Sequence, residues 1–307
     1  MSKHIVVTGA TGNIGSRLVH ALLQRGHRVT AVARSAEHLA ALEQAGAAIR
    51  PGQLGDEAFL TEVLRGADAA FLLLPPNTTS ADVLRDQDVL GEAVAAAVRA
   101  SGLRQVVNLS SIAADRPAGT GPIVTVHRQE KRLNAIEGLS VVHLRPAYFM
   151  ENLLANIGLI HGLGFAGGAI RPELRFPMIA TQDIAAHAAE LLDGPALPAG
   201  HSEQLLLGPR SYSMQEVAAV LGRAIGRPEL PYVPFDYEQA KGGMMGAGLS
   251  ESMADLYIEM TRTLNAEEAM VHEVRTAANT TPTTLEAFAE QVFAPAFRAA
   301  APQPVAG

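Results

Sequence analysis

The sequence has no cysteine and no tryptophan, and its anionic residues outnumber its cationic ones. Without cysteine the chain has no disulfide, no thiolate ligand for a metal and no cysteine nucleophile. The formal net charge of −7 over 307 residues disfavours a nucleic-acid-binding surface, so we expect no nucleic-acid partner.

Long hydrophobic runs are also missing. No segment approaches the ~20 apolar residues that span a membrane, so we expect no membrane partner. The first apolar run, residues 5–7, is too short for the core of a signal peptide, which favours a cytoplasmic location. The histidines show neither His-x-x-x-His nor His-Glu-x-x-His spacing, and the sequence predicts no metal site.

Three glycines follow this first apolar run at regular spacing. Residues 5–7 are typical of a buried strand, and Gly9, Gly12 and Gly15 lead from it into an amphipathic helical pattern. A strand, a glycine-rich turn and a helix hold a diphosphate, because glycines let the backbone approach and the helix N-terminus attracts anions. The first two glycines are three apart instead of the usual two, so a plain structural turn is the alternative. The flanking strand and helix favour a dinucleotide site.

Arg34 closes the second expected strand, residues 28–33. In dinucleotide folds the end of this strand meets the adenosine ribose, and an acidic residue there binds the 2′-hydroxyl of NAD. Here the first acid after the strand is Glu37, and the guanidinium of Arg34 suits a 2′-phosphate. We therefore expect NADP(H) as the cofactor, the alternative being a solvated arginine at a strand end.

Strands and helices alternate through the first half of the chain, which predicts an α/β fold with a doubly wound parallel sheet of the Rossmann type. We expect this domain over residues 1–152, with residues 175–192 returning to it. Residues 153–300 are expected to form a smaller, interleaved α/β region that caps a substrate. Within it, the glycine-rich stretch 242–248 is expected to be loose, and residues 299–307 are expected to be a frayed tail.

Several segments together resemble the NmrA-like family of atypical short-chain dehydrogenases/reductases. They are Val7–Gly15, Arg34, Leu144–Pro146, Phe149–Asn152, Asp183–Ala186 and Thr284–Phe288. The resemblance extends over nearly the whole chain. It implies a Rossmann domain that binds NADP(H) and a small C-terminal domain that closes over a cleft.

The resemblance also implies which residues contact each part of the cofactor. The diphosphate would be lined by Gly9, Thr11, Gly12, Asn13 and Ile14, and the adenine by Gln53 and Leu54. Leu74 and Pro75 would border the ribose, Ser110 and Ser111 would approach the nicotinamide, and Pro146, Ala147, Tyr148 and Phe149 would lie against it. The family often has aspartate at position 53, where this chain has glutamine.

Reductases of the wider superfamily use Tyr-x-x-x-Lys, in which tyrosine is the acid and lysine binds the nicotinamide ribose. This sequence has His127 in the tyrosine position and Lys131 in the lysine position. We consider His127, Lys131, Tyr148 and Ser111 as catalytic candidates. The alternatives are a partly exposed helix residue for His127, a solvated cation for Lys131, a core or cleft-wall aromatic for Tyr148 and a strand-end cap for Ser111.

Two functions follow from this reading. The first is an NADPH-dependent reductase of a small electrophile, such as a quinone, an azo compound, an imine or an activated alkene. The second is a non-catalytic NADP(H)-binding sensor that acts through a protein partner. A homodimer is compatible with the sequence, which leaves the substrate and the stereochemistry open.

Overall fold

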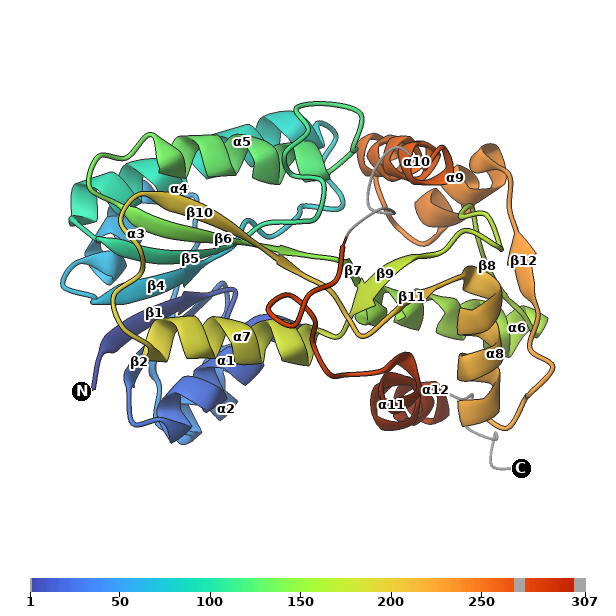
Figure 1. The fold of residues 1–307 in the computed structure, drawn as a ribbon. Coiled ribbons are helices and arrows are strands. Elements are labelled where there is room, and N and C mark those ends of the chain that lie inside the picture. Colours follow the sequence, from blue (N-terminus) through green and yellow to red (C-terminus); the bar gives the residue numbers. More distant parts are fainter. Residues whose placement is uncertain (1, 268–273, 301–307) are drawn as a thin grey trace.

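A seven-stranded parallel sheet forms the larger region of the computed structural model, which describes residues 2–267 and 274–300 (Figure 1). Its strands are β1 (His4–Thr8), β2 (Arg28–Ala33), β3 (Ala48–Pro51), β4 (Ala69–Leu72), β5 (Gln105–Leu109), β6 (Ser140–Pro146) and β10 (His201–Leu206). Their order is β10-β6-β5-β4-β1-β2-β3, and every pair is parallel. The direction of winding reverses between β1 and β4, which confirms the predicted doubly wound fold.

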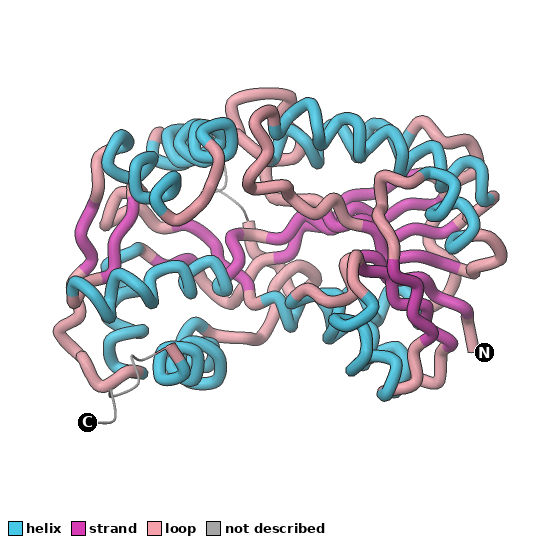
Figure 2. Tube along the Cα trace, turned by 180° about the vertical axis from the view of Figure 1, so that it is seen from behind, coloured by secondary structure: helices cyan, strands magenta, loops and turns pink. Residues whose placement is uncertain are grey.

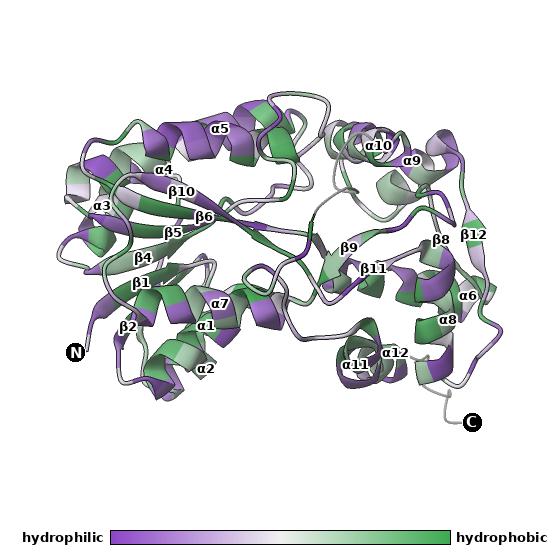
Figure 3. Cartoon of the chain, in the orientation of Figure 1, coloured by the Kyte–Doolittle hydropathy of each residue, from purple (hydrophilic) through white to green (hydrophobic). Residues whose placement is uncertain are grey.

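Helices cover both faces of this sheet, as the views from front and back show (Figures 1 and 2). One layer contains α1 (Asn13–Gln24), α2 (Ala36–Gln44) and α7 (Thr181–Asp193), and the other contains α3 (Glu57–Leu64), α4 (Val83–Ser101) and α5 (Ile123–Asn134). Ile5 and Val7 pack in one hydrophobic cluster and Val6 in the other, and none of the three is exposed. This two-sided burial explains why the strand is apolar at consecutive positions (Figure 3).

The smaller region contains two short sheets surrounded by helices. The sheets pair β7 (Tyr148–Phe149) and β11 (Ser211–Tyr212) with β9 (Phe176–Ile179), and β8 (Ala166–Gly168) with β12 (Tyr232–Pro234). The helices are α6 (Ile157–Leu163), α8 (Met214–Ala224), α9 (Tyr237–Gly246), α10 (Glu251–Asn265), α11 (Leu285–Phe288) and α12 (Ala294–Ala299). A 3-10 helix, Met150–Asn156, leads into α6, and a π-helical turn, Ala289–Phe293, joins α11 to α12.

The chain passes between the two regions more than once. After β9, helix α7 packs against α1, and β10 extends the large sheet beside β6. The returning segment is therefore Thr181–Leu206, whereas Phe176–Ile179 pairs within the smaller region. No helix in the described ranges is long and apolar enough to cross a membrane.

The expectation that residues 242–248 form a loose loop is wrong, because most of this stretch belongs to α9. A capping box between Asp236 and Gln239 begins the helix. Lys241 then forms ion pairs with Glu251 and Asp255 of α10, at 2.9 and 2.6 Å. These contacts stabilise a helix that glycine content alone disfavours. Residues 301–307 of the predicted frayed tail lie outside the described residues.

Helix α10 fixes the smaller region above the carboxyl edge of the large sheet. Ser250, which caps α10, donates its backbone N–H to the carbonyl of Thr78 at 2.9 Å. The backbone N–H of Val83, at the start of α4, donates to the Oγ of Ser252 at 3.1 Å. The loop after β4 is thus held between the two regions.

Candidate cofactor and active site

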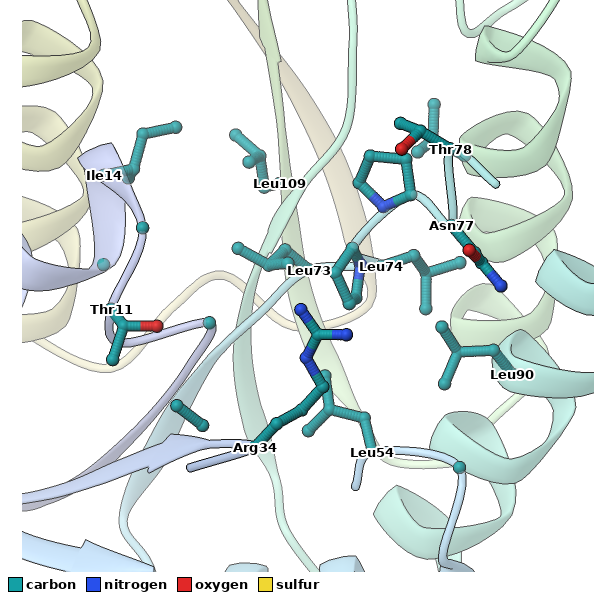
Figure 4. Close-up of a pocket in the computed structure, with 18 of the residues that line it drawn as sticks. Thr11, Ile14, Arg34, Leu54, Leu73, Leu74, Asn77, Thr78, Leu90 and Leu109 are labelled. Carbon is teal, nitrogen blue, oxygen red and sulfur yellow. The ribbon is translucent and has the colours of Figure 1, made fainter. Parts of the chain in front are cut away.

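A cavity of about 1090 Å³ follows the carboxyl edge of the sheet (Figure 4). It extends from Arg34 at the end of β2, past the glycine turn after β1 and the loop after β4, to Ser110 and Ser111 at the end of β5. Phe149 and Thr181 belong to its wall at that far end. The cavity therefore crosses the point where the strand order reverses, where open α/β sheets bind ligands.

The glycine turn after β1 has a geometry that side chains would prevent. Gly9 has a φ of +61°, in the left-handed region that favours glycine. A Cβ atom at Gly15 would lie 2.2 Å from the carbonyl oxygen of Gly9, so α1 packs directly on the turn. The backbone N–H of Gly12 donates to the same carbonyl at 3.0 Å. The backbone of α1 therefore contacts the backbone of the turn directly, which requires glycine at position 15.

The N-terminus of α1 is left open toward the cavity. Gly12 is the N-cap residue and has no side chain to accept a hydrogen bond from the first turn, which also contains no acidic residue. The first backbone N–H of the helix to reach an intrahelical carbonyl is that of Ser16, which donates to Gly12 at 3.0 Å. The preceding N–H groups and the positive end of the helix dipole suit a diphosphate.

Arg34 supplies a cation at one end of the cavity. Its side chain is exposed and extends from the end of β2 toward Leu74 (Figure 4). It forms no hydrogen bond or ion pair with the part of the chain that the structure describes. Asp86 is the one carboxylate among the described lining residues, and it accepts a hydrogen bond from Ser80 at 2.6 Å. The free guanidinium therefore fits a phosphate group.

At the other end of the cavity, Ser110 forms a hydrogen bond with Glu130, which is ion-paired with Arg145 behind the cavity wall. Its hydroxyl donates to Oε1 of Glu130 at 2.5 Å. Arg145 donates to both oxygens of Glu130, through Nε at 3.0 Å and Nη2 at 2.6 Å. The hydrogen bonds to Glu130 raise the pKa of Arg145 above its usual value. Ser111, by contrast, is half-buried and makes no side-chain hydrogen bond within the described residues.

Helix α5 presents different residues to the cavity from those expected. Val126 lines the cavity and Glu130, one turn later, reaches Ser110. His127 is buried and its Nδ1–H donates to the carbonyl of Ala114 at 2.7 Å, while Lys131 is exposed to solvent. Neither His127 nor Lys131 is among the residues that line the cavity. The two pairs are each four residues apart but lie about 100° apart around the helix.

Tyr148 also lies outside the cavity lining. Its ring packs edge-on against Phe176, with 5.4 Å between centroids. Burial, together with nearby Tyr257, raises the pKa of the Tyr148 phenol to about 12, despite a hydrogen bond with Asn152. The next residue of the strand, Phe149, points the opposite way and lines the cavity.

Most of the predicted cofactor contacts come together in this cavity. The lining includes Gly9, Thr11, Gly12, Asn13, Ile14, Arg34, Gln53, Leu54, Leu74, Pro75, Ser110, Ser111 and Phe149. Pro146, the last residue of β6, and Ala147, which follows it, are buried and do not line the cavity. In addition, no group of three or more metal-ligating side chains gathers in residues 2–267 and 274–300.

A family model described as the NmrA-like family matches residues 1–289. The chain belongs to the NmrA-like family. Its sequence is 32% identical to a NAD(P)H azoreductase of Xenophilus azovorans over 260 residues, which cover 83% of this chain and 85% of the relative.

Solved structures share the fold of this NmrA-like protein. A NADPH-dependent quinone oxidoreductase of Escherichia coli superposes with a TM-score of 0.77 at 23% identity, covering 94% of this chain and 99% of that one. NmrA, a negative transcriptional regulator crystallised with NADP, superposes with a TM-score of 0.74 at 18% identity, covering 97% of each chain. The shared fold is therefore found with both an enzyme and a regulator.

Some lining residues of this NmrA-like protein were not predicted from the sequence. They include Leu73, Arg85, Val89, Leu90, Leu109, Val126 and Thr181. Residues 77–79 also line the cavity, as expected of a loop that follows a central strand at its carboxyl end. Thr181 begins α7, and only the fold brings it to the cavity.

We expect Lys131→Ala to change the affinity for NADPH by less than about twofold, because this exposed side chain does not line the cavity. Fluorescence titration with NADPH measures this directly. A loss of tenfold or more would show that the ammonium group reaches the ribose when the cofactor binds.

Proposed function

We propose that this NmrA-like protein is an NADPH-dependent reductase of a small electrophile, such as a quinone, an azo compound, an imine or an activated alkene. The observation that carries the proposal is the continuous cavity. One end has a free guanidinium, the middle has an open helix N-terminus, and the far end has a partly apolar wall. The names of the azoreductase and quinone oxidoreductase relatives support this choice of substrate class.

The lining residues divide into three groups along the cavity. Arg34 would bind the 2′-phosphate, with Gln53 and Leu54 beside the adenine. The turn residues, Gly9 to Ile14, would hold the diphosphate. Leu74, Pro75, Ser110, Ser111 and Phe149 would surround the nicotinamide ribose and ring, and the smaller region, residues 153–300, would cover the acceptor.

When bound, NADPH supplies a hydride, and the protein supplies orientation and a dry pocket. Leu109, Val126 and Phe149 provide apolar wall at the reactive end. The titratable candidates His127, Lys131 and Tyr148 lie outside the lining. We therefore infer that the acceptor takes its proton from solvent, as quinones and azo compounds do readily.

A second candidate function is an NADP(H) sensor that acts through a protein partner. The location of His127, Lys131 and Tyr148 outside the cavity lining favours this function, as does the similarity to the regulator NmrA. Under this alternative the cavity binds the nucleotide without turnover.

NADPH oxidation followed at 340 nm across quinones, azo dyes, imines and activated alkenes tests the two functions. We expect at least one acceptor to raise the rate tenfold or more above the reaction without protein. Tight NADPH binding with no acceptor turned over would favour the sensor.

A further inference from the structure

Two hydroxyl groups in the wall of the cavity are each hydrogen-bonded to a carboxylate behind the wall. Ser110 donates to Glu130 at 2.5 Å. Thr181, at the start of α7, donates its hydroxyl to Glu151, and its backbone N–H also donates to Glu151 at 3.0 Å. Neither glutamate lines the cavity, although both hydroxyl-bearing residues do.

Each carboxylate also accepts hydrogen bonds from groups other than these hydroxyls. Glu130 is 4% exposed and receives two hydrogen bonds from the guanidinium of Arg145. Glu151 lies at the N-terminus of α7, where the helix dipole and the N–H of Thr181 favour an anion. An ionised carboxylate only accepts hydrogen bonds. Each hydroxyl must therefore give its single hydrogen to the glutamate.

The direction of these hydroxyl hydrogens determines which hydrogen bonds the two hydroxyls can form with a ligand. A serine or threonine hydroxyl has one hydrogen and two lone pairs. With the hydrogen directed at the glutamate, Ser110 and Thr181 present only lone pairs to the cavity. They can accept a hydrogen bond from a ligand but cannot donate one, so neither is placed to deliver a proton.

The position of these hydroxyls indicates which part of a dinucleotide they meet. Arg34 marks the 2′-phosphate end of the cavity, and the glycine turn marks the diphosphate in the middle. The remaining end, at Ser110 and Thr181, is left for the nicotinamide. Its carboxamide carries an NH₂ group with two hydrogens to donate.

We propose that Glu130 and Glu151 are positioning residues that orient Ser110 and Thr181 as acceptors for the carboxamide NH₂. This inference rests on the proposed NADP(H) binding and deepens it. It makes the reactive end of the cavity selective for a primary amide. It also fixes the rotation of the nicotinamide ring, and hence the face that meets the acceptor.

Binding of nucleotide analogues tests the proposal without turnover. Titrations use NADP⁺, its thionicotinamide analogue, which keeps the NH₂, and its 3-acetylpyridine analogue, which has a methyl ketone instead. We expect the native protein to bind the first two within about threefold and the third about tenfold or more weakly, since a tenfold change is about 1.4 kcal/mol. Equal binding of all three would overturn the proposal.

Variants then assign the preference to particular residues. In Ser110→Ala and Thr181→Val we expect NADP⁺ to bind more weakly while the acetylpyridine analogue changes little. In Glu130→Met the hydroxyl of Ser110 is free to turn and donate, so the acetylpyridine analogue should bind more tightly and NADP⁺ less tightly. Equal losses of affinity for NADP⁺ and for the acetylpyridine analogue in every variant would overturn the proposal. Ser110→Ala provides this test even if Glu130→Met does not fold.

Two controls separate the possible failures. Glu62→Met removes a glutamate paired with Arg50 at 2.7 Å outside the cavity, and it should leave all three affinities unchanged. The fragment 2′-phospho-ADP-ribose lacks the nicotinamide and should bind all variants equally. If neither NADP⁺ nor this fragment binds, the proposed function fails. If both bind without discrimination between analogues, only the inference about Glu130 and Glu151 fails.

Discussion

Replacing Arg34 with alanine is expected to weaken NADPH binding by about 10- to 150-fold and to change NADH binding by less than about twofold. Hydrogen bonds to charged groups contribute about 1.5–3 kcal/mol, which corresponds to this range. The guanidinium is exposed, extends into the cavity and has no partner among the described residues, so its interaction with the 2′-phosphate displaces no existing ion pair. NADH has no 2′-phosphate and should not respond.

Calorimetric titration of both nucleotides measures the difference. Arg17→Ala is the matched control, because Arg17 is an exposed arginine on α1 outside the cavity lining. Arg34→Lys keeps the charge but loses the planar pair of donors, and it should give an intermediate loss. Equal losses of NADPH and NADH affinity in Arg34→Ala would refute the assignment of the 2′-phosphate to this residue.

Replacing Gly15 with alanine is expected to abolish detectable nucleotide binding and to lower the free energy of unfolding by about 1–3 kcal/mol. The added Cβ would lie 2.2 Å from the carbonyl oxygen of Gly9 and 2.9 Å from the Cα of Ala10. Both contacts are with backbone, so no side-chain rotation relieves them. Helix α1 would have to move away from the turn, taking its open N-terminus out of register with the diphosphate.

Denaturant unfolding and NADPH titration measure the two effects separately. Gly162→Ala in α6 is the control, because nothing lies within 4 Å of its added Cβ. Alanine is the better helix former, so this variant should be unchanged or up to about 1 kcal/mol more stable. Normal NADPH binding by Gly15→Ala would mean that the turn does not hold the cofactor.

The fold and one end of the cavity could be predicted because their signals are local. Residues 5–7 are apolar at consecutive positions because helices cover both faces of the sheet. Gly9, Gly15 and Arg34 occupy positions that the backbone path of a single βαβ unit determines. Gly9 and Gly15 are close to each other both in sequence and in space.

The reactive end could not be predicted in the same way. Spacing places His127 and Lys131 on one face of α5, but it places Val126 and Glu130 on one face equally well. On the face that meets the cavity, Glu130 pairs with Arg145, a contact between a helix and a strand. The hydrogen bond of Thr181 to Glu151 likewise joins residues 30 apart. Contacts between residues so far apart in sequence cannot be predicted from the local pattern of apolar and polar residues.

The repeated passage of the chain between the two regions has a consequence for folding. In the sequence, β7, β8 and β9 of the smaller region come before β10, which belongs to the large sheet. Neither region is therefore a continuous stretch of sequence that could fold alone. The two regions should therefore unfold as one cooperative unit. A nucleotide that binds only the native chain would therefore stabilise both regions. At a concentration of 100 times its Kd it would raise the free energy of unfolding by about 2.7 kcal/mol. The occupancy of the cavity would then set how often the two regions unfold together.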